Sequence, residues 1–147
     1  MKPVYPLNQL YFYLTAGCNL ACRHCWISPA FQREGHSYPE LPVDLFGSII
    51  EQAKSLGLSA VKLTGGEPLL HSRILELIRH IREENLVLTL ETNGVLCTQE
   101  LAREISAGRE PFVSVSLDGA TAGTHEWVRG VPGSFDAAVR GIRKVMG

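Results

Sequence analysis

Short apolar runs alternate along the chain with longer stretches whose apolar residues recur every three or four positions. The short runs predict strands over residues 9–15, 60–64, 86–90 and 112–117. The periodic stretches predict helices that begin near Val43, Ser72, Thr98 and Ser134. The last three of these residues have side chains that favour the N-cap position. The pattern therefore predicts four successive units of strand, loop and helix.

Strands that alternate with helices of this length favour an α/β fold with a parallel sheet and right-handed crossovers. A partial barrel and an open doubly wound sheet both fit the pattern. In either fold the carboxyl ends of the strands share one edge, where ligands bind. Four polar or glycine-rich loops should meet at that edge: residues 18–42, 65–68, 92–94 and 116–119.

Composition narrows the possible classes of function. The 147 residues favour one domain spanning 1–147, and the net charge of -1 gives no sign of nucleic-acid binding. No apolar run is long enough for a membrane span, and the first residues do not resemble a signal peptide. We therefore expect a cytoplasmic protein whose four cysteines are metal ligands or catalysts rather than disulfide partners.

Three cysteines, Cys18, Cys22 and Cys25, have the spacing C-x3-C-x2-C in the loop after the first strand. Thiolates suit both iron-sulfur clusters and zinc. Three thiolates on a four-iron cluster leave one iron open to an external molecule. A zinc site would need a fourth ligand such as His36 or Cys97, and three inert buried thiols are a further alternative. The triad alone leaves these alternatives open.

The triad, followed by Gly65, Gly66, Glu67 and Pro68 after the second strand and by residues 116–119 after the fourth, resembles the radical S-adenosylmethionine (SAM) superfamily. The resemblance extends from Gln9 to Val145. It implies a partial (β/α)6 TIM-like barrel, of which this chain carries four βα units and lacks two. It also implies a 4Fe-4S cluster that cleaves SAM reductively, giving a 5′-deoxyadenosyl radical that abstracts hydrogen from a substrate.

The resemblance assigns the cluster to the triad and SAM to the neighbouring loops. Cys18, Cys22 and Cys25 would hold the cluster, with His24 against the adenine. Gly65 and Gly66 would allow the backbone to approach SAM, offering carbonyl oxygens to its ammonium group, and Glu67 would add a charged hydrogen bond to that group.

Further positions of the resemblance follow the third and fourth strands. Asn93 would line the SAM pocket, and Ser116 and Asp118 would lie near the ribose. Arg129 would pair with the SAM carboxylate through its guanidinium fork. For His125 and Glu126, contact with the site and a place on a helix surface are equally compatible with the sequence, and Cys97 is expected to be a plain buried cysteine.

Among radical SAM proteins the chain looks most like maturases of ribosomally made peptides. This implies a precursor peptide as substrate, with backbone splicing or epimerisation as the reaction. It also implies an electron donor such as flavodoxin or ferredoxin, and a second protein subunit is one way to complete the barrel. The alternative is a non-catalytic peptide-recognition or partner subunit of a radical SAM complex. No nucleic acid and no membrane partner are expected.

Overall fold

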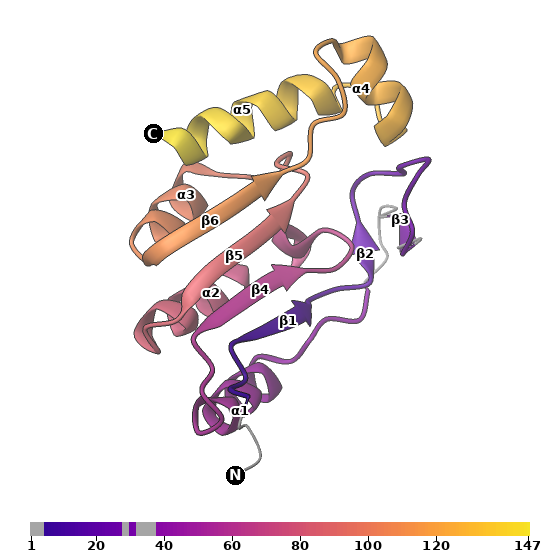
Figure 1. Cartoon of the computed structure of the whole chain (residues 1–147). Helices are drawn as coiled ribbons and strands as arrows, with labels where there is room; N and C mark the ends of the chain where they lie inside the picture. The colour runs from indigo at the N-terminus through magenta and orange to yellow at the C-terminus, as the bar shows by residue number, and fades with distance from the viewer. Residues whose placement is uncertain (1–4, 28–29, 32–37) are drawn as a thin grey trace.

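The computed structural model describes residues 5–27, 30–31 and 38–147. Its main sheet is fully parallel, with the strand order β1-β4-β5-β6. The strands are β1 (Gln9–Tyr13), β4 (Ala60–Thr64), β5 (Val87–Thr92) and β6 (Arg109–Val115), as Figure 1 shows. The predicted α/β class and parallel sheet are confirmed.

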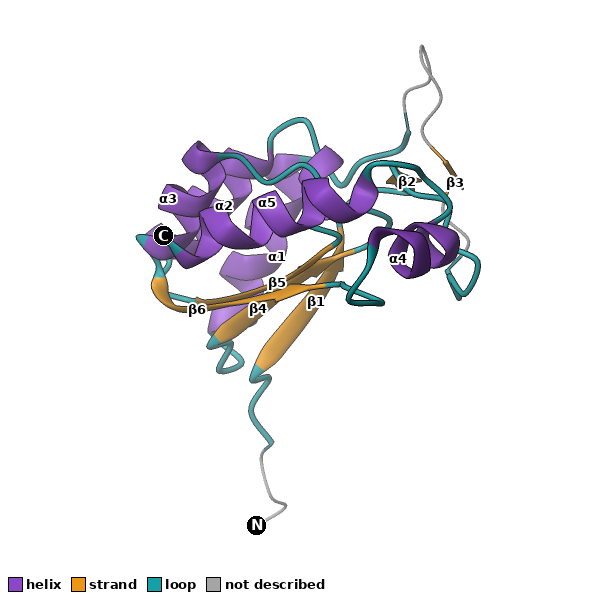
Figure 2. Ribbon diagram, turned by 90° about the horizontal axis from the view of Figure 1, so that it is seen from above, coloured by secondary structure: helices purple, strands orange, loops and turns teal. Residues whose placement is uncertain are grey.

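One face of this sheet is covered by helices. They are α1 (Val43–Lys54), α2 (Ile74–Glu83), α3 (Gln99–Ser106) and α5 (Ser134–Met146). Figure 2 shows α2, α3 and α5 over the same face. Alternate strand residues point into the core between the layers. There the Phe12 ring lies 4.6 Å from that of Phe46, and the helices and strands contribute buried Ile50, Leu63, Leu77, Ile81 and Leu90.

The other face of the sheet is open. In the described part of the chain no helix lies over it (Figure 2), and it carries exposed aromatic side chains, among them Tyr11, Tyr13 and Phe112. Among the described residues, every helix is too short or too polar to span a lipid bilayer.

Two of the three predicted helix caps are wrong. Thr98 does cap α3, since its hydroxyl accepts a hydrogen bond from the Leu101 N–H at 3.1 Å. Ser72 instead donates to the Glu40 carboxylate at 2.6 Å, and α2 begins only at Ile74. Ser134 is already the first residue of α5 and caps nothing.

Several short elements were not predicted from the sequence. Strands β2 (Gly17–Cys18) and β3 (Ala30–Phe31) pair within the long segment that was predicted to be the loop after the first strand. A 3₁₀ turn, η1 (Pro68–Leu70), follows β4, and helix α4 (Ala122–Arg129) lies between β6 and α5. Elements of two or three residues are too short to show a hydrophobic period, and α4 has few apolar residues.

The buried sides of α1 and α5 are not formed simply by their large apolar residues. Leu45 and Leu56 are largely exposed, whereas Phe46, Ile50 and Ala53 form the buried side of α1. On α5 the buried residues are the small ones, Ser134, Ala138 and Gly141, because the helix backbone comes very close to the loop after β5. A search for large apolar residues does not find such a contact.

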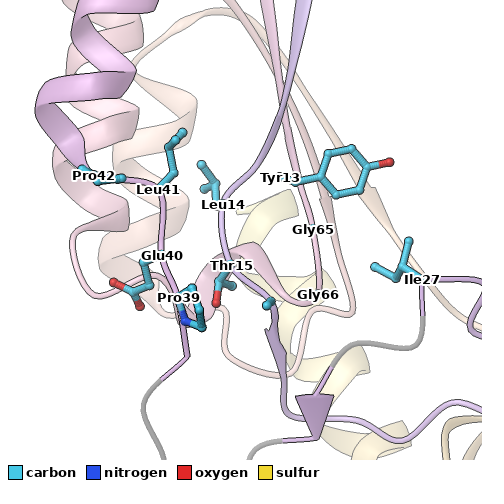
Figure 3. A pocket seen from close by; sticks show the side chains of 11 residues that line it. Tyr13, Leu14, Thr15, Ile27, Pro39, Glu40, Leu41, Pro42, Gly65 and Gly66 are labelled. Carbon is cyan, nitrogen blue, oxygen red and sulfur yellow. The ribbon is translucent and has the colours of Figure 1, made fainter.

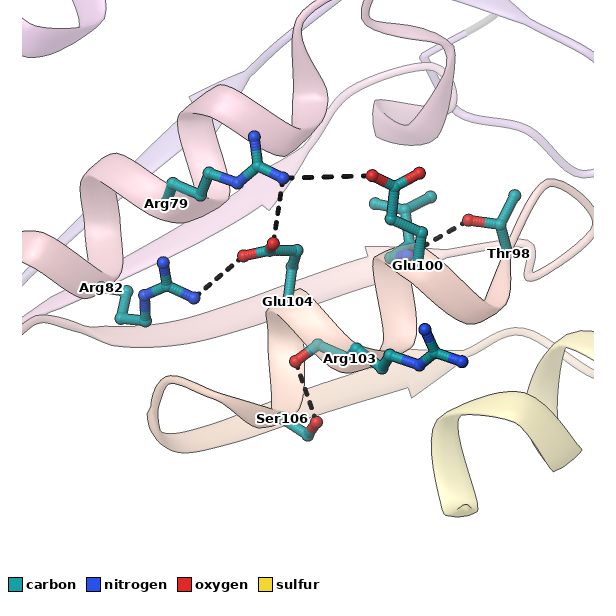
Figure 4. Close-up of polar contacts among 8 residues, drawn as sticks. Arg79, Arg82, Thr98, Glu100, Arg103, Glu104 and Ser106 are labelled. Atoms are coloured by element: carbon teal, nitrogen blue, oxygen red, sulfur yellow. Dashed lines mark hydrogen bonds and ion pairs between the residues drawn. The ribbon is translucent and has the colours of Figure 1, made fainter.

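An ion-pair network joins the outer surfaces of α2 and α3 (Figure 4). The Glu104 carboxylate lies 2.9 Å from both Arg79 and Arg82, and a hydrogen bond from Arg79 holds the pKa of that carboxyl below its ordinary value. Arg79 also lies 4.0 Å from Glu100. Because these side chains are solvated, the network contributes little to stability.

Candidate cofactor-binding site

A cavity of about 310 Å³ lies at the carboxyl edge of the sheet, where the four predicted loops meet. Nine of the residues predicted to form the site line it: Cys18, Cys22, Cys25, Gly65, Gly66, Glu67, Asn93, Ser116 and Arg129. His24 is exposed and Asp118 stands just outside, so neither lines the cavity. The remaining lining includes Thr64 and Glu91, which the sequence did not single out.

Helix α4 holds the cysteine loop in place. Its last carbonyl groups accept hydrogen bonds from the Ala21 N–H, at 3.1 Å on the Arg129 oxygen, and from the Arg23 N–H, at 2.9 Å on the Val128 oxygen. The Arg23 side chain donates to the Trp127 oxygen at 2.7 Å and stacks on the Trp127 ring. The orphan carbonyls of the helix end thus fix the backbone on either side of Cys22.

Gly130 makes this contact possible. It ends α4 in the left-handed conformation, with φ of 73°. A Cβ atom here would lie 2.4 Å from the Ala21 carbonyl oxygen, inside the contact distance of the two atoms. Only glycine allows the helix end and the cysteine loop to come this close.

The three thiols all border the same cavity. Within the described residues no group of three His, Cys, Asp or Glu side chains is close enough together to hold one metal ion. Cys97 is buried in the core away from this cavity, as predicted, so it is not placed as a fourth zinc ligand. His36 lies outside the described residues. Burial raises the pKa of the Cys18 thiol to about 11 when no metal is bound.

The loop after β4 is hydrogen-bonded to the segment that leads from β1 to the cysteine triad. The Gly66 N–H donates to the Thr15 oxygen at 3.0 Å, and the Glu67 N–H donates to the Gly17 oxygen at 2.9 Å. Gly65 has φ of 133°, which side chains rarely adopt, and a Cβ atom there would lie 3.0 Å from the Thr15 oxygen. Gly65 therefore lets the backbone cross close to the segment after β1, at the rim of the cavity.

Glu67 is buried and joins two of the loops. Its carboxylate accepts hydrogen bonds from the Thr92 hydroxyl at 2.6 Å, the Asn93 N–H at 2.8 Å and the Leu69 N–H at 3.0 Å. Burial raises the pKa of this carboxyl. The sequence suggested a ligand contact for Glu67, and the structure adds this bracing role.

Replacing Glu67 with glutamine is expected to lower the free energy of unfolding by about 1–3 kcal/mol, because the new amide NH2 faces N–H donors it cannot satisfy. Urea denaturation of the cofactor-free chain measures this. Glu76→Gln, which alters an exposed ion pair with Arg73, is the control and should change stability little. Equal stabilities of the two variants would show that the hydrogen bonds to Glu67 do not hold the loops.

Arg129 lies between the triad and the loop after β6. It is buried, pairs with the Asp118 carboxylate, and approaches the Cys22 sulfur with its Nη1 at 3.5 Å. The guanidinium therefore places positive charge beside the Cys22 sulfur. Asn93 similarly reaches the cysteine loop, since its side-chain NH2 donates to the Asn19 oxygen at 2.7 Å.

His125 and Glu126 have structural roles. His125 is buried, its Nδ1 accepts a hydrogen bond from the Asp118 N–H at 3.3 Å, and its ring packs on Phe135. Glu126 accepts a hydrogen bond from the Gly133 N–H at 2.8 Å. Neither residue lines the cavity, and the surface alternative for His125 is wrong.

The buried imidazole predicts a pH dependence. Burial lowers the pKa of His125, so the unfolded chain binds a proton more readily than the folded chain. Stability should fall as the pH drops from about 7 through the ordinary histidine range, by at most about 1.4 kcal/mol per pH unit from this group. Urea unfolding at several pH values should show this slope, and His125→Gln should remove it. If the variant kept the slope, a titratable group other than His125 would be responsible for the pH dependence of stability.

A second cavity, of about 530 Å³, adjoins the first (Figure 3). It lies between the end of β1 and the segment 39–42, and shares Ile27, Gly65 and Gly66 with the cysteine-lined cavity. The Tyr13 ring points toward Ile27 at its border. The two cavities form adjoining spaces along the same edge of the sheet.

The arrangement of these loops agrees with a known family. The model of the radical SAM superfamily matches residues 12–146, which is nearly the whole chain. The chain belongs to the radical SAM superfamily. The cofactors of this family are the expected 4Fe-4S cluster and SAM.

Solved structures of radical SAM proteins share the fold. SuiB of Streptococcus suis, bound to its precursor peptide SuiA, superimposes with a TM-score of 0.75 at 21% identity, over 96% of this chain and 31% of SuiB. The protein anSMEcpe, with bound AdoMet and a peptide, gives a TM-score of 0.72 at 26% identity, over 97% of this chain and 40% of its own. The sheet is therefore that of the partial TIM barrel, and the doubly wound alternative is excluded.

Curated radical SAM relatives are closer in sequence. The AdoMet-dependent heme synthase of Methanosarcina barkeri is 39% identical over 130 residues, which cover 88% of this chain and 36% of the relative. The mycofactocin maturase MftC of Mycolicibacterium smegmatis is 36% identical over 132 residues, which cover 90% of this chain and 32% of the relative. The chain thus spans about a third of the length of these relatives.

Proposed function

We propose that this chain is the cluster- and SAM-binding part of a radical SAM enzyme that modifies a peptide. The observation that carries the proposal is the single cavity bordered by Cys18, Cys22 and Cys25 and by the loops after β4, β5 and β6. Three thiols of the right chemistry, a glycine-lined rim and buried charged groups gather there. The four βα units at 1–147 would form one incomplete core domain of the enzyme.

Each lining residue has a proposed task. Cys18, Cys22 and Cys25 would bind three irons of a 4Fe-4S cluster. Gly65 and Gly66, which have no side chains, would let the backbone approach the methionyl end of SAM. Glu67 has lone-pair capacity left beside its three donors, and would accept a hydrogen bond from the SAM ammonium.

Arg129 would form an ion pair with the SAM carboxylate. Its guanidinium is buried, borders this cavity and lies beside the Cys22 sulfur. Ser116 and Asn93 border the same space, where they would contact the nucleoside part of SAM. Asp118 holds Arg129 and would lie near the ribose. His24 would contact adenine from its exposed position on the loop.

When bound, the cluster supplies one electron that splits SAM into methionine and a 5′-deoxyadenosyl radical, which takes a hydrogen atom from the substrate. The residues that line the cavity would orient SAM. The open face of the sheet would then need cover, supplied by further chain or by a second protein subunit. An electron donor such as flavodoxin or ferredoxin would provide the electron in the cytoplasm.

A peptide substrate is supported by the fold shared with SuiB and by the identity with MftC. Splicing or epimerisation of a precursor peptide remains the proposed outcome. A second candidate substrate, an iron porphyrin, is favoured by the 39% identity with an AdoMet-dependent heme synthase and the 33% identity with an Fe-coproporphyrin III synthase.

Deuterium transfer tests the substrate class directly. The reconstituted, reduced chain would be mixed with SAM and either a tryptic digest of perdeuterated protein or iron coproporphyrin III deuterated on its propionates. We expect 5′-deoxyadenosine carrying deuterium from the peptides, measured by mass spectrometry. Deuterium from the porphyrin alone would establish the second candidate instead. SAM bound but never cleaved would favour the non-catalytic partner subunit.

A further inference from the structure

The open face of the sheet carries two rows of side chains that run across all four strands. The strand register places Tyr11, Lys62, Thr89 and Phe112 in one row. The second row lies nearer the cysteines, and its members Thr64, Glu91 and Ser114 line the cavity. Tyr11 is 59% and Phe112 62% exposed, which is unusual for large aromatic side chains at the ends of one row.

An ion pair lies at the centre of this face. The Lys62 ammonium is 2.5 Å from the Glu91 Oε1 atom, and the Thr64 hydroxyl donates to Oε2 at 3.2 Å. Lys62 also stands over the Tyr11 ring, 4.8 Å from its centroid. The hydrogen bond to Glu91 raises the pKa of Lys62, so the ammonium stays charged. The pair is thus fixed in place by side chains from three neighbouring strands.

The pair keeps unused hydrogen-bonding capacity. The ammonium has three N–H donors and the carboxylate about four acceptor sites, and the contacts above use only some of them. A free cation or anion would meet a like charge at one member of the pair. A group with a donor and an acceptor side by side meets an opposite partner at both.

A peptide residue in an extended conformation is such a group, because its N–H and C=O point to the same side of the backbone. We propose that the Lys62–Glu91 pair positions the peptide substrate by one extended residue, with Glu91 accepting from its N–H and Lys62 donating to its C=O. Flanking side chains of the peptide would rest on Tyr11 and Phe112. This inference rests on the proposed peptide-modifying function and adds the backbone contact that presents the peptide to the cavity.

Binding of matched probes to the chain without cluster tests this contact. The first probe is N-acetyl-Phe-Ala-Phe-amide, and the second is its depsipeptide, in which an ester oxygen replaces the alanine N–H. Titration of the isotope-labelled chain, followed by NMR, gives both dissociation constants. We expect the amide probe to bind about 10-fold more tightly, as one hydrogen bond to a carboxylate warrants.

Variants assign the preference to the pair. In Glu91→Leu the preference for the amide probe should vanish. Lys62→Met should lower the affinity of the chain for both probes. Lys54→Met is the matched control, because it breaks another Lys–Glu pair, with Glu84, on the helical side. Urea unfolding checks that each variant is folded.

Three results would overturn the proposal. They are equal affinities of the two probes for the unaltered chain, binding of neither probe, and a preference that survives in Glu91→Leu. Because no cluster is present, these outcomes are independent of whether the chain binds and cleaves SAM.

Discussion

Replacing Cys22 with alanine is expected to abolish the cluster. Two thiolates cannot hold three irons, and Cys22 is also the thiol that Arg129 contacts. After anaerobic reconstitution with iron and sulfide, we expect the variant to retain almost no iron or acid-labile sulfide per chain. Cys18→Ala and Cys25→Ala should behave alike. Iron and sulfide analysis on desalted protein measures the loss.

Cys97→Ala provides the control for this loss. Cys97 is as buried as Cys18 but lies in the hydrophobic core, so its removal should cost some stability and leave iron binding intact. Far-UV circular dichroism would confirm that all four variants are folded. Full iron content in a triad variant, or loss of iron in Cys97→Ala, would mean that the triad is not the metal site.

The second large effect is expected for Gly130→Ala. The added methyl group would lie 2.4 Å from the Ala21 carbonyl oxygen, so either α4 or the cysteine loop must move. Since the last carbonyls of α4 accept the hydrogen bonds that fix this loop, we expect a several-fold fall in iron bound per chain. Alanine in the left-handed conformation adds a cost of about 1 kcal/mol to the folded state.

Gly133→Ala separates the steric clash with the cysteine loop from the cost of placing alanine in the left-handed conformation. Gly133 has a similar φ of 79°, but nothing lies within 4 Å of a Cβ atom built on it. This variant should therefore show the backbone cost alone, as a small decrease in unfolding free energy with normal iron content. If both variants bind iron equally well, the contact between α4 and the cysteine loop does not hold the site.

The sequence predicted the four strands and helices of the main fold because the strands are short apolar runs and the helices have apolar residues every three or four positions. It also placed the triad and the GGEP residues at the same edge, since parallel strands end together. Strand β6 begins at Arg109, earlier than predicted, because Arg109 and Glu110 are polar and exposed. Periodicity does not detect such residues.

The missed features depend on contacts between distant segments. The burial of His125 against Phe135, and the bracing of Thr92 by Glu67, cannot be read from local pattern. The role of α4 in holding the cysteine loop rests on backbone carbonyls, which any sequence supplies. Only Gly130, at the end of the last helical turn before Val131, gave a local sign of that helix end.

The Lys62–Glu91 pair was missed for a related reason. Lys62 sits in the middle of an otherwise apolar strand, and Glu91 precedes the Thr92, Asn93 and Gly94 segment by one position. Each alone reads as an ordinary solvated residue. The strand register brings them together on the open face.

One iron of a triad-bound cluster should be open to SAM. This can be measured by electron paramagnetic resonance of the anaerobically reconstituted, reduced chain, recorded with and without SAM. We predict the signal of a reduced 4Fe-4S cluster that depends on Cys18, Cys22 and Cys25 and changes when SAM is added. A cluster signal that SAM leaves unchanged, or zinc bound by the thiols with no cluster signal, would show that the triad does not provide such an iron.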